Sequence, residues 1–482
     1  MNEIPHEKPY HLDPEDWAAF RRLAHRALDL AIEDLESIRE RPVWVETPDW
    51  VKDRLVSPIP RQGKGLEAVL EDFYQLIQPY GVGNRHPCFM GWAHGAGTAV
   101  GIVAEMLAAG LNLNCGGRNH IGVELERRLA AGLAAQFGFP ASADGIFVTG
   151  TSQANFIGVL AARRAALGEP LRERGLSGAP LTAYASAEAH GCVAQALEMA
   201  GLGRNALRSI VCDSQGRIRP DLLREAIRAD RKSGMTPFLI VGTAGTVNFG
   251  AFDPLDELAS IAADEGLWLH VDGAFGALAI FSDALRPLLS GVERADSIGF
   301  DFHKWAHVPY DCGFILARDG DSLRETFSAP AAYLSRAKKG LASGETWACD
   351  LGPDLSRGFR ALKVWMTLQS YGTESLGAAM DANCAAARHL AALVNKSDLF
   401  RLAAPAPLNI VCFTTERPEG NRALVEALHL EGAAAPSLTL IDGNPVIRCA
   451  LFNHRTEIAD VDIFFAKAEA LARQLIAYEC SG

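Results

Sequence analysis

The chain has 482 residues, of which 49% are hydrophobic and 22% are charged, and its net charge is −12. This balance is that of a folded protein with a large apolar core, so wholesale disorder is excluded. An acidic chain without a basic block is also a poor binder of nucleic acid or of an anionic membrane surface. A local pocket for one small anion is compatible with this charge.

The first 80 residues predict a helical arm. Apolar residues recur at helical spacing over residues 14–40, and a second helix is predicted over residues 66–77. Proline-rich chain, interpreted as extended, separates the two helices. Because such an arm buries little apolar surface by itself, we expect it to pack on the rest of the protein or on a second subunit.

Beyond residue 81, short apolar segments alternate with longer helical ones. The expected strands cover residues 145–149, 181–186, 209–212, 238–242, 267–271, 297–300 and 313–317. A helix is predicted over residues 253–265, between two of these strands. This alternation is typical of an α/β domain with a mainly parallel sheet covered by helices on both faces.

The pattern changes near residue 356 and predicts a smaller α+β domain. Its expected helices cover residues 355–368, 376–394 and 458–478, and its expected strands cover residues 410–414 and 446–450. We therefore predict three parts: an arm over residues 1–80, a large domain over residues 81–355 and a small domain over residues 356–482.

Several common motifs are absent from the sequence. It contains no GxxxxGK[ST] phosphate loop, no HExxH and no GxSxG, and GAGTAVG at residues 95–101 has the wrong spacing for a dinucleotide fingerprint. The 13 histidines form no group with zinc-ligand spacing, so no metal is expected. Ten scattered cysteines, no secretory signal and no long apolar run predict a cytoplasmic protein that does not span a membrane.

Two residues at predicted strand ends suggest the chemistry. Asp272 follows an apolar strand, and Lys304 lies between His303 and Trp305 after the next strand. The carboxyl ends of parallel strands are where α/β sheets bind ligands. Each residue also has an interpretation without a catalytic role, since Asp272 could cap a turn and Lys304 could extend into solvent. Together, however, a lysine that can form a Schiff base and a carboxylate for a pyridine nitrogen are what a pyridoxal phosphate enzyme requires.

A place for the cofactor phosphate is also predicted. Thr151 and Ser152 follow a strand end and a glycine turn, at the start of a helix whose free N–H groups attract an anion. The alternative is an ordinary helix cap. His190 follows another predicted strand and could stack on one face of the pyridine ring, and Ala274 is small enough to contact the other face.

The sequence resembles a known family over roughly residues 80–370. The shared segments are HPCF at His86, TGTSQAN at Thr149, AEAH ending at His190, GTAGTVNFGAFDP at Gly242, WLHVDGAFG at Trp268, ADSIGFDFHKW at Ala295, DCG at Asp311 and RGFRALKVW at Arg357. These segments are similar to those of the group II pyridoxal-phosphate-dependent amino acid decarboxylases, which include aromatic amino acid and glutamate decarboxylases.

The resemblance implies a fold type I transferase fold and a carboxy-lyase that converts an L-amino acid to the amine and CO2. It also implies a homodimer with active sites at the subunit interface and an exchanged N-terminal arm. The implied roles are Lys304 for the covalent cofactor link, Asp272 for the ring nitrogen, His190 for stacking, Thr151, Ser152 and His303 for the phosphate, Thr246 near the substrate carboxylate or the cofactor, and Ser356 for the phosphate of the neighbouring subunit.

One departure concerns the proton donor. The family carries a tyrosine in a mobile loop that protonates the substrate carbon after CO2 leaves, but residues 334–357 contain no tyrosine. Trp347 lies close to the expected position, and indole is not an acid near neutral pH, so His190 or water would have to donate. Loss of the tyrosine is associated with oxidative deamination in this family, which leaves an aldehyde synthase as an alternative. A non-catalytic scaffold is a third reading, which Lys304 and Asp272 oppose.

The substrate pocket is the second departure. By position, Trp92, His94 and Trp347 would line the substrate pocket, and Ala93 replaces a residue that is often a bulky aromatic. Arg118 and His120 suggest a polar substrate side chain, although both could simply pack at an interface. Aromatic, acidic and diamino substrates all remain open at this point.

Overall fold

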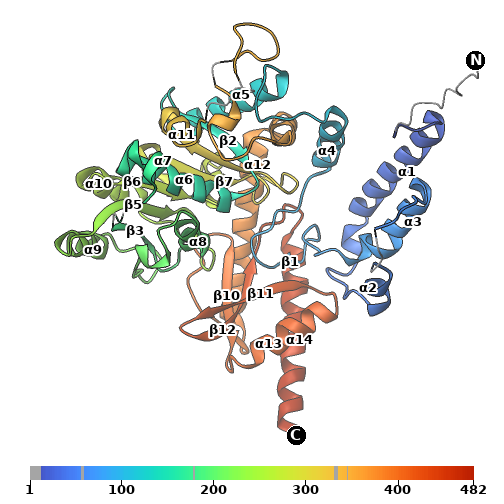
Figure 1. Cartoon of the computed structure of the whole chain (residues 1–482). Coiled ribbons are helices and arrows are strands. Elements are labelled where there is room, and N and C mark those ends of the chain that lie inside the picture. Colours follow the sequence, from blue (N-terminus) through green and yellow to red (C-terminus); the bar gives the residue numbers. More distant parts are fainter. Residues whose placement is uncertain are drawn as a thin grey trace, which may run out of the picture.

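The computed structural model describes residues 12–55, 59–176, 178, 180–329, 335–344 and 346–481. Figure 1 shows a large domain around one sheet, a smaller domain near the C-terminus, and a group of N-terminal helices that stands apart from both.

The large domain contains a seven-stranded sheet with the order β2-β8-β7-β6-β5-β3-β4. The strands are β2 (Asp144–Val148), β3 (Leu181–Ser186), β4 (Leu207–Ile210), β5 (Thr236–Thr243), β6 (Trp268–Asp272), β7 (Ser297–Asp301) and β8 (Gly313–Ala317). Strands β4, β3, β5, β6 and β7 run parallel, while β8 is antiparallel to both β7 and β2. The predicted mainly parallel sheet is therefore confirmed.

Helices cover both faces of this sheet. One face packs against α6 (Thr151–Leu167), α8 (Cys192–Met199) and α11 (Gly320–Phe327), and the other against α5 (Ile121–Gln136), α9 (Pro220–Lys232), α10 (Leu255–Glu265) and α12 (Arg360–Lys396). Because side chains alternate along a strand, Leu269 and Val271 of β6 enter the second of these cores. His270 and Asp272 of the same strand consequently face α6.

The small domain has a five-stranded sheet with the order β1-β11-β12-β10-β9. Its strands are β1 (Phe89–Met90), β9 (Phe400–Leu402), β10 (Ile410–Thr415), β11 (Ala435–Ile441) and β12 (Asn444–Ala450), and its helices include α13 (Gly420–Leu430) and α14 (Ile458–Ser481). Strand β1 pairs with β11, so residues 89–90 lie in the small sheet although the sequence grouped them with the large domain. Strands β9 and β11 were not predicted. The division into domains stays a prediction.

The two helices predicted over residues 355–368 and 376–394 form one element, α12, with a non-helical Gly372 at φ 70°. The element begins later than predicted, at Arg360. The backbone of Arg357 bonds to the Asn114 side chain and to the Cys115 N–H instead of entering a helix.

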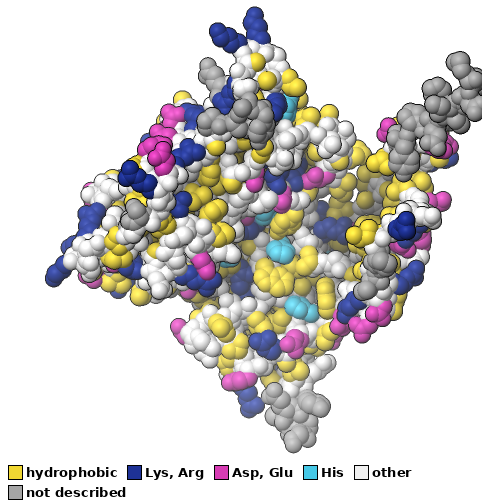
Figure 2. Space-filling model, viewed as in Figure 1, with side chains coloured by type: hydrophobic (Ala, Val, Ile, Leu, Met, Phe, Trp, Pro, Cys, Tyr) yellow, Lys and Arg dark blue, Asp and Glu magenta, His cyan; other side chains and the backbone are white. Residues whose placement is uncertain are grey.

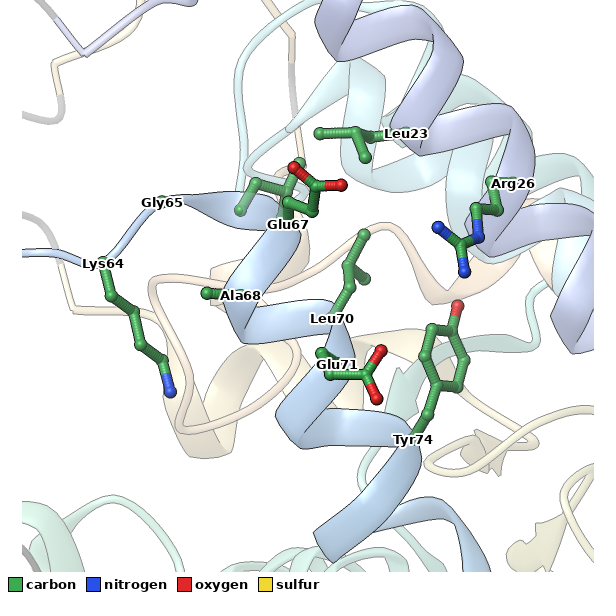
Figure 3. Close-up of a pocket in the computed structure, with 10 residues that line it drawn as sticks. Leu23, Arg26, Lys64, Gly65, Glu67, Ala68, Leu70, Glu71 and Tyr74 are labelled. Atoms are coloured by element: carbon green, nitrogen blue, oxygen red, sulfur yellow. The ribbon is translucent and has the colours of Figure 1, made fainter.

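The arm consists of α1 (Trp17–Glu36), α2 (Asp49–Leu55) and α3 (Leu66–Leu76). Helix α2 corrects the prediction of extended chain between the other two. Figure 3 shows an open groove between α1 and α3, where Arg26 extends toward Tyr74. Large apolar side chains remain exposed on these two helices: Trp17, Phe20, Ile32, Leu66, Val69 and Phe73. The arm forms little core of its own, as expected.

The cysteines in the described part of the chain are free thiols, and most of them are buried. Within the same ranges, no helix combines the length and the apolar composition that crossing a bilayer requires.

Candidate functional site

A cavity of about 370 Å3 lies at the carboxyl ends of β5, β6 and β7. Its walls come from these strand ends, from the start of α6 and from the segment before α4 (Ala99–Leu111). Nine of the predicted site residues line it: Trp92, His94, Thr151, Ser152, His190, Asp272, Ala274, His303 and Lys304. Figure 2 shows histidine and hydrophobic side chains gathered near the centre of this face of the molecule.

Asp272 forms the floor of the cavity and is 2% exposed. Its Oδ2 accepts a hydrogen bond from Asn155 Nδ2 at 2.9 Å, and its Oδ1 accepts one from the Ala274 N–H at 3.2 Å. Burial raises the pKa of Asp272, while the charge of Lys304 and the bond from Asn155 act in the opposite direction. A cationic group bound in the cavity would therefore strongly favour the ionised form of Asp272 over the protonated form.

Lys304 is partly buried, with 22% of its side chain exposed. Its Nζ lies 3.1 Å from Asp301 Oδ2, and the other oxygen of Asp301 accepts a hydrogen bond from the Thr151 N–H at 2.7 Å. Asp301 thus connects the lysine to the start of α6. Asp301 was not singled out from the sequence, although it occupies the end of β7 in the same way that Asp272 ends β6.

The start of α6 offers unpaired polar groups to the cavity. The helix begins at Thr151 after Gly150, which has no side chain to cap it. The buried Oγ1 of Thr151 has no hydrogen-bond partner among the described residues, and the side chain of Ser152 is exposed. A hydroxyl left unpaired at the N-terminus of a long helix fits a phosphate group.

His303 has a defined protonation state. Its Nδ1 accepts a hydrogen bond from the Cys312 N–H at 2.9 Å, and burial lowers its pKa to about 4. The neutral ring therefore carries its proton on Nε2, the nitrogen on the side of Asp301. This N–H can donate to a phosphate oxygen.

His190 also lines the cavity, where it accepts a hydrogen bond from the Cys192 N–H through Nδ1 at 3.2 Å. This contact fixes the imidazole ring just beyond the end of β3, the strand that pairs directly with β5. The second expected ring contact, Ala274, lines the same cavity just beyond Asp272.

Aromatic rings form the mouth of the cavity. His94 stacks on Trp92 with ring centres 5.9 Å apart, and it meets the edge of Tyr310 at 5.9 Å. Tyr310 in turn lies 4.3 Å from the ring of His303. Burial lowers the pKa of His94, and burial raises the pKa of Tyr310 to about 12, so both rings are uncharged near neutral pH.

Tyr310 was not singled out from the sequence, because only the neighbouring DCG segment carried a signal. Arg448 was also missed. It is almost fully buried in β12 and donates hydrogen bonds to the carbonyls of Val247 at 2.8 Å and Trp92 at 3.0 Å. A lone arginine within an apolar strand was the available signal, and it ties the small domain to the cavity wall.

Three predicted residues do not line the cavity of their own chain. Thr246 is buried behind it and accepts a hydrogen bond from the Ala251 N–H. Ser356 is exposed elsewhere. Trp347 is buried, and the guanidinium carbons of Arg118 and Arg336 lie over its ring, 4.6 and 5.1 Å from the ring centre.

Arg118 and His120, which suggested a polar substrate side chain, also do not line this cavity of their own chain. His120 caps α5 by accepting a hydrogen bond from the Gly122 N–H. Residues 334–357 contain no tyrosine, and two of them, Leu334 and Glu345, lie outside the described residues.

The residues around the cavity match the needs of pyridoxal phosphate. A lysine can hold its aldehyde, a carboxylate can face its ring nitrogen, and an unpaired hydroxyl with helix N–H groups can hold its phosphate. Among the described residues, no group of three or more His, Cys, Asp and Glu side chains is arranged to bind a metal ion.

Comparisons with known proteins agree with this assignment. Residues 48–416 match the pyridoxal-dependent decarboxylase conserved domain. The chain is 33% identical to an aromatic-L-amino-acid decarboxylase of Bacillus atrophaeus, over 95% of this chain and 97% of that one. It is 28% identical to a phenylacetaldehyde synthase of Arabidopsis thaliana, over 92% and 94% of the two chains. Among solved structures, Oryza sativa TDC with PLP and tryptamine superposes with a TM-score of 0.88 and 26% identity, over 96% of this chain and all of that one.

Proposed function

The chain belongs to the pyridoxal-dependent decarboxylase family, and from that premise we propose that it decarboxylates aromatic L-amino acids to the corresponding amines. It is a pyridoxal-phosphate-dependent amino acid decarboxylase, and its cofactor is pyridoxal phosphate. The observation that carries the finer proposal is the position of Lys304 and Asp272 on one cavity whose mouth consists of aromatic rings.

When bound, the cofactor supplies an electron sink for the pair released as the bond to the carboxylate carbon breaks. In the proposed site, Lys304 holds the cofactor covalently and Asp272 keeps the proton on its ring nitrogen. Thr151, Ser152 and the Nε2–H of His303 bind its phosphate. His190 stacks on its ring and orients it.

A proton must return to the substrate carbon after CO2 departs. The phenol of Tyr310 retains its proton near neutral pH, because burial raises its pKa to about 12. The raised pKa makes this phenol a weaker acid than an ordinary tyrosine. Its place on the cavity wall is what makes Tyr310, with His190 and water, a candidate donor instead of the loop tyrosine that residues 334–357 lack.

The aromatic substrate class is supported by the chemistry of the mouth. Trp92, His94 and Tyr310 offer ring faces and edges, which suit aromatic side chains. Apart from Lys304, the described residues that line the cavity include no lysine or arginine to pair with an acidic side chain. A similar Bacillus protein bears the name aromatic-L-amino-acid decarboxylase.

A screen of substrates tests this proposal. The purified protein loaded with pyridoxal phosphate is given L-tryptophan, L-tyrosine, L-phenylalanine, L-glutamate or L-2,4-diaminobutyrate, and CO2 and amine are measured. We expect release from an aromatic substrate, and none from a Lys304→Ala variant, which also loses the covalent cofactor absorbance. Preferential release from glutamate or diaminobutyrate would overturn the aromatic assignment.

We also propose that the protein is a homodimer through its arm. The exposed apolar side chains of α1 and α3, and the open groove between these helices, favour burial against a second copy. Replacing the exposed Phe73 with aspartate should lower the mass found by sedimentation from dimer to monomer, while Glu67→Gln on the same helix should not. A wild-type protein that sediments as a monomer would contradict the proposal. A cytoplasmic location remains a prediction.

An aldehyde synthase is the second candidate. It is favoured by the absence of a tyrosine from residues 334–357 and by the similarity to a phenylacetaldehyde synthase. In this reaction, one amino acid, one O2 and one water give an aldehyde, CO2, ammonia and hydrogen peroxide, so O2 is reduced as the amine carbon is oxidised. Oxygen uptake equal to CO2 release would establish it, whereas amine equal to CO2 without oxygen uptake would exclude it.

A further inference from the structure

Three alternate residues of β6 lie on one face of the sheet and lead toward the cavity. Trp268 begins the strand, His270 is central and fully buried, and Asp272 ends it. Because side chains alternate along a strand, all three point toward the α6 side. Of these three side chains, only Asp272 has a role in the proposed chemistry, and the buried His270 has none.

Residues of two neighbouring elements connect these three side chains. The first residue of β7, Ser297, accepts a hydrogen bond from the indole Nε1–H of Trp268 at 2.9 Å and bonds His270 Nδ1 at 2.8 Å. Asn155 of α6 bonds His270 Nε2 through Oδ1 at 2.9 Å, and it donates from Nδ2 to Asp272 at 2.9 Å. We call Trp268, Ser297, His270, Asn155 and Asp272 the β6 hydrogen-bond chain.

The direction of every bond in this chain follows from its two ends and from the neutral His270 ring. An indole N–H can only donate, and an ionised carboxylate can only accept. Asn155 donates from its NH2 group to Asp272, so its Oδ1 accepts and Nε2 of His270 must carry the proton between them. Because the neutral ring has no second proton, Nδ1 of His270 accepts and Ser297 donates to it. Each group donates once along the chain, and the series ends on Oδ2 of Asp272.

The protonation of His270 agrees with this direction. Burial lowers its pKa to about 3, so the ring is neutral and has one proton for its two bonded nitrogens. Protonated Asp272 would interrupt the series, because a hydroxyl at Oδ2 would face the NH2 group of Asn155. The chain of hydrogen bonds therefore favours the ionised carboxylate and acts to lower the pKa of Asp272, whereas burial raises it.

The backbone is shaped to admit the histidine. A Cβ on Gly158 of α6 would lie 2.6 Å from Nδ1 of His270, and a Cβ on Gly299 of β7 would lie 3.1 Å from Oδ1 of Asn155. Both positions are glycine. The helix can thus approach β6 closely enough for Asn155 to bridge His270 and Asp272.

We infer that His270 and Asn155 are positioning residues that hold Asp272 as a carboxylate aimed into the cavity, and so keep the proton on the cofactor ring nitrogen. The inference rests on the proposed role of Asp272. Neither residue touches the reacting atoms, and each acts through Asp272. A purely structural role would affect folding stability but not the protonation of the ring.

The test measures the ring nitrogen itself. The protein is loaded with pyridoxal phosphate labelled with nitrogen-15 in the ring, and its chemical shift reports whether that nitrogen is protonated. We expect the protonated signal in the wild type, and the unprotonated signal in Asp272→Asn. Asn155→Leu and His270→Phe, which remove the polar atoms at similar volume, should move it the same way and weaken cofactor binding roughly tenfold.

Two further variants separate this role from a loss of packing. His270→Gln keeps one donor and one acceptor and should restore much of the protonated signal. Tyr184→Phe removes a buried hydroxyl from another network of the same sheet, with Thr182 and Asp230, and should leave the signal unchanged. Melting of the cofactor-free variants identifies any that fail to fold. If one of Asn155→Leu and His270→Phe does not fold, the other carries the test; if neither folds, Trp268→Phe, which removes the first donor of the chain, is expected to shift the signal in the same direction by less, and an unchanged signal overturns the inference.

The outcomes are distinguishable. If Asp272→Asn leaves the nitrogen protonated, the proposed role of Asp272 fails and the inference falls with it. If Asp272→Asn moves the signal but folded Asn155→Leu and His270→Phe proteins do not, the site assignment stands and the inference is overturned.

Discussion

The floor and the mouth of the cavity are built differently. At the floor, Asp272, Asn155 and His270 are nearly or fully buried, and their polar atoms are bonded to one another and to the backbone. At the mouth, Trp92 is 53% exposed and Tyr310 is 48% exposed. Nδ1 of His94 at the mouth has no hydrogen-bond partner among the described residues.

This difference separates two tasks. A buried and fully bonded floor is complete within one chain and can set the charge on a ring nitrogen without rearrangement. Partly exposed rings at the mouth can take a substrate side chain, and they leave surface for a second subunit to cover. The floor thus suits the shared chemistry of the family, and the mouth suits substrate selection.

The largest expected effect is at the floor. Asp272→Asn keeps the shape of the side chain but removes the charge that pairs with the ring nitrogen. We expect kcat/KM for the best substrate to fall about 1000-fold, equivalent to about 4 kcal/mol of transition-state stabilisation. CO2 release measures this loss. Asp283→Asn, at a fully exposed side chain, is the control, and a loss below tenfold for Asp272→Asn would contradict the prediction.

A pH dependence of stability should also come from the floor. Burial lowers the pKa of His270 from 6.5 to about 3, so the unfolded chain takes up a proton below pH 6.5 that the folded chain does not. The stability contributed by the neutral ring is present above that value and is lost as the pH falls. From about pH 8 to about pH 5, the free energy of unfolding should fall about 2 kcal/mol more for the cofactor-free wild type than for His270→Gln.

Urea unfolding at several pH values checks this difference. His25→Gln, at an exposed position on α1, should follow the wild type. Parallel curves for the wild type and His270→Gln would show that the ring does not remain neutral.

The smallest expected effect is at the mouth. Tyr310→Leu removes an aromatic edge and a phenol beside His94 and His303. We expect KM for an aromatic substrate to rise about tenfold, or about 1.4 kcal/mol, while the ring-nitrogen signal of the bound cofactor stays protonated. A large fall in kcat at unchanged KM would instead favour Tyr310 as the proton donor. A change in the ring-nitrogen signal would show that the mouth also affects the charge on the ring nitrogen, and would contradict the assignment of separate tasks to floor and mouth.

The sequence by itself identified the order of elements and the residues at strand ends. Asp272, His190 and Lys304 could be found because an apolar strand followed by a polar residue marks the ligand-binding edge of a parallel sheet, whatever its neighbours are. The same local rule, applied to Asp301, would have found it too. The alternation of Trp268, His270 and Asp272 along β6 was also visible in the sequence, but the hydrogen bonds that connect these side chains were not.

Only the tertiary structure decided which side chains meet. Asn155 reaches both Asp272 and His270 because α6 lies close over β6 and β7, a contact between residues more than 100 positions apart. Within its own chain, Trp347 contacts two arginines and does not line the cavity, since distance along the chain does not fix direction in space. Periodicity and strand ends are local properties that a sequence carries, whereas hydrogen-bond partners depend on packing between elements, which no local pattern specifies.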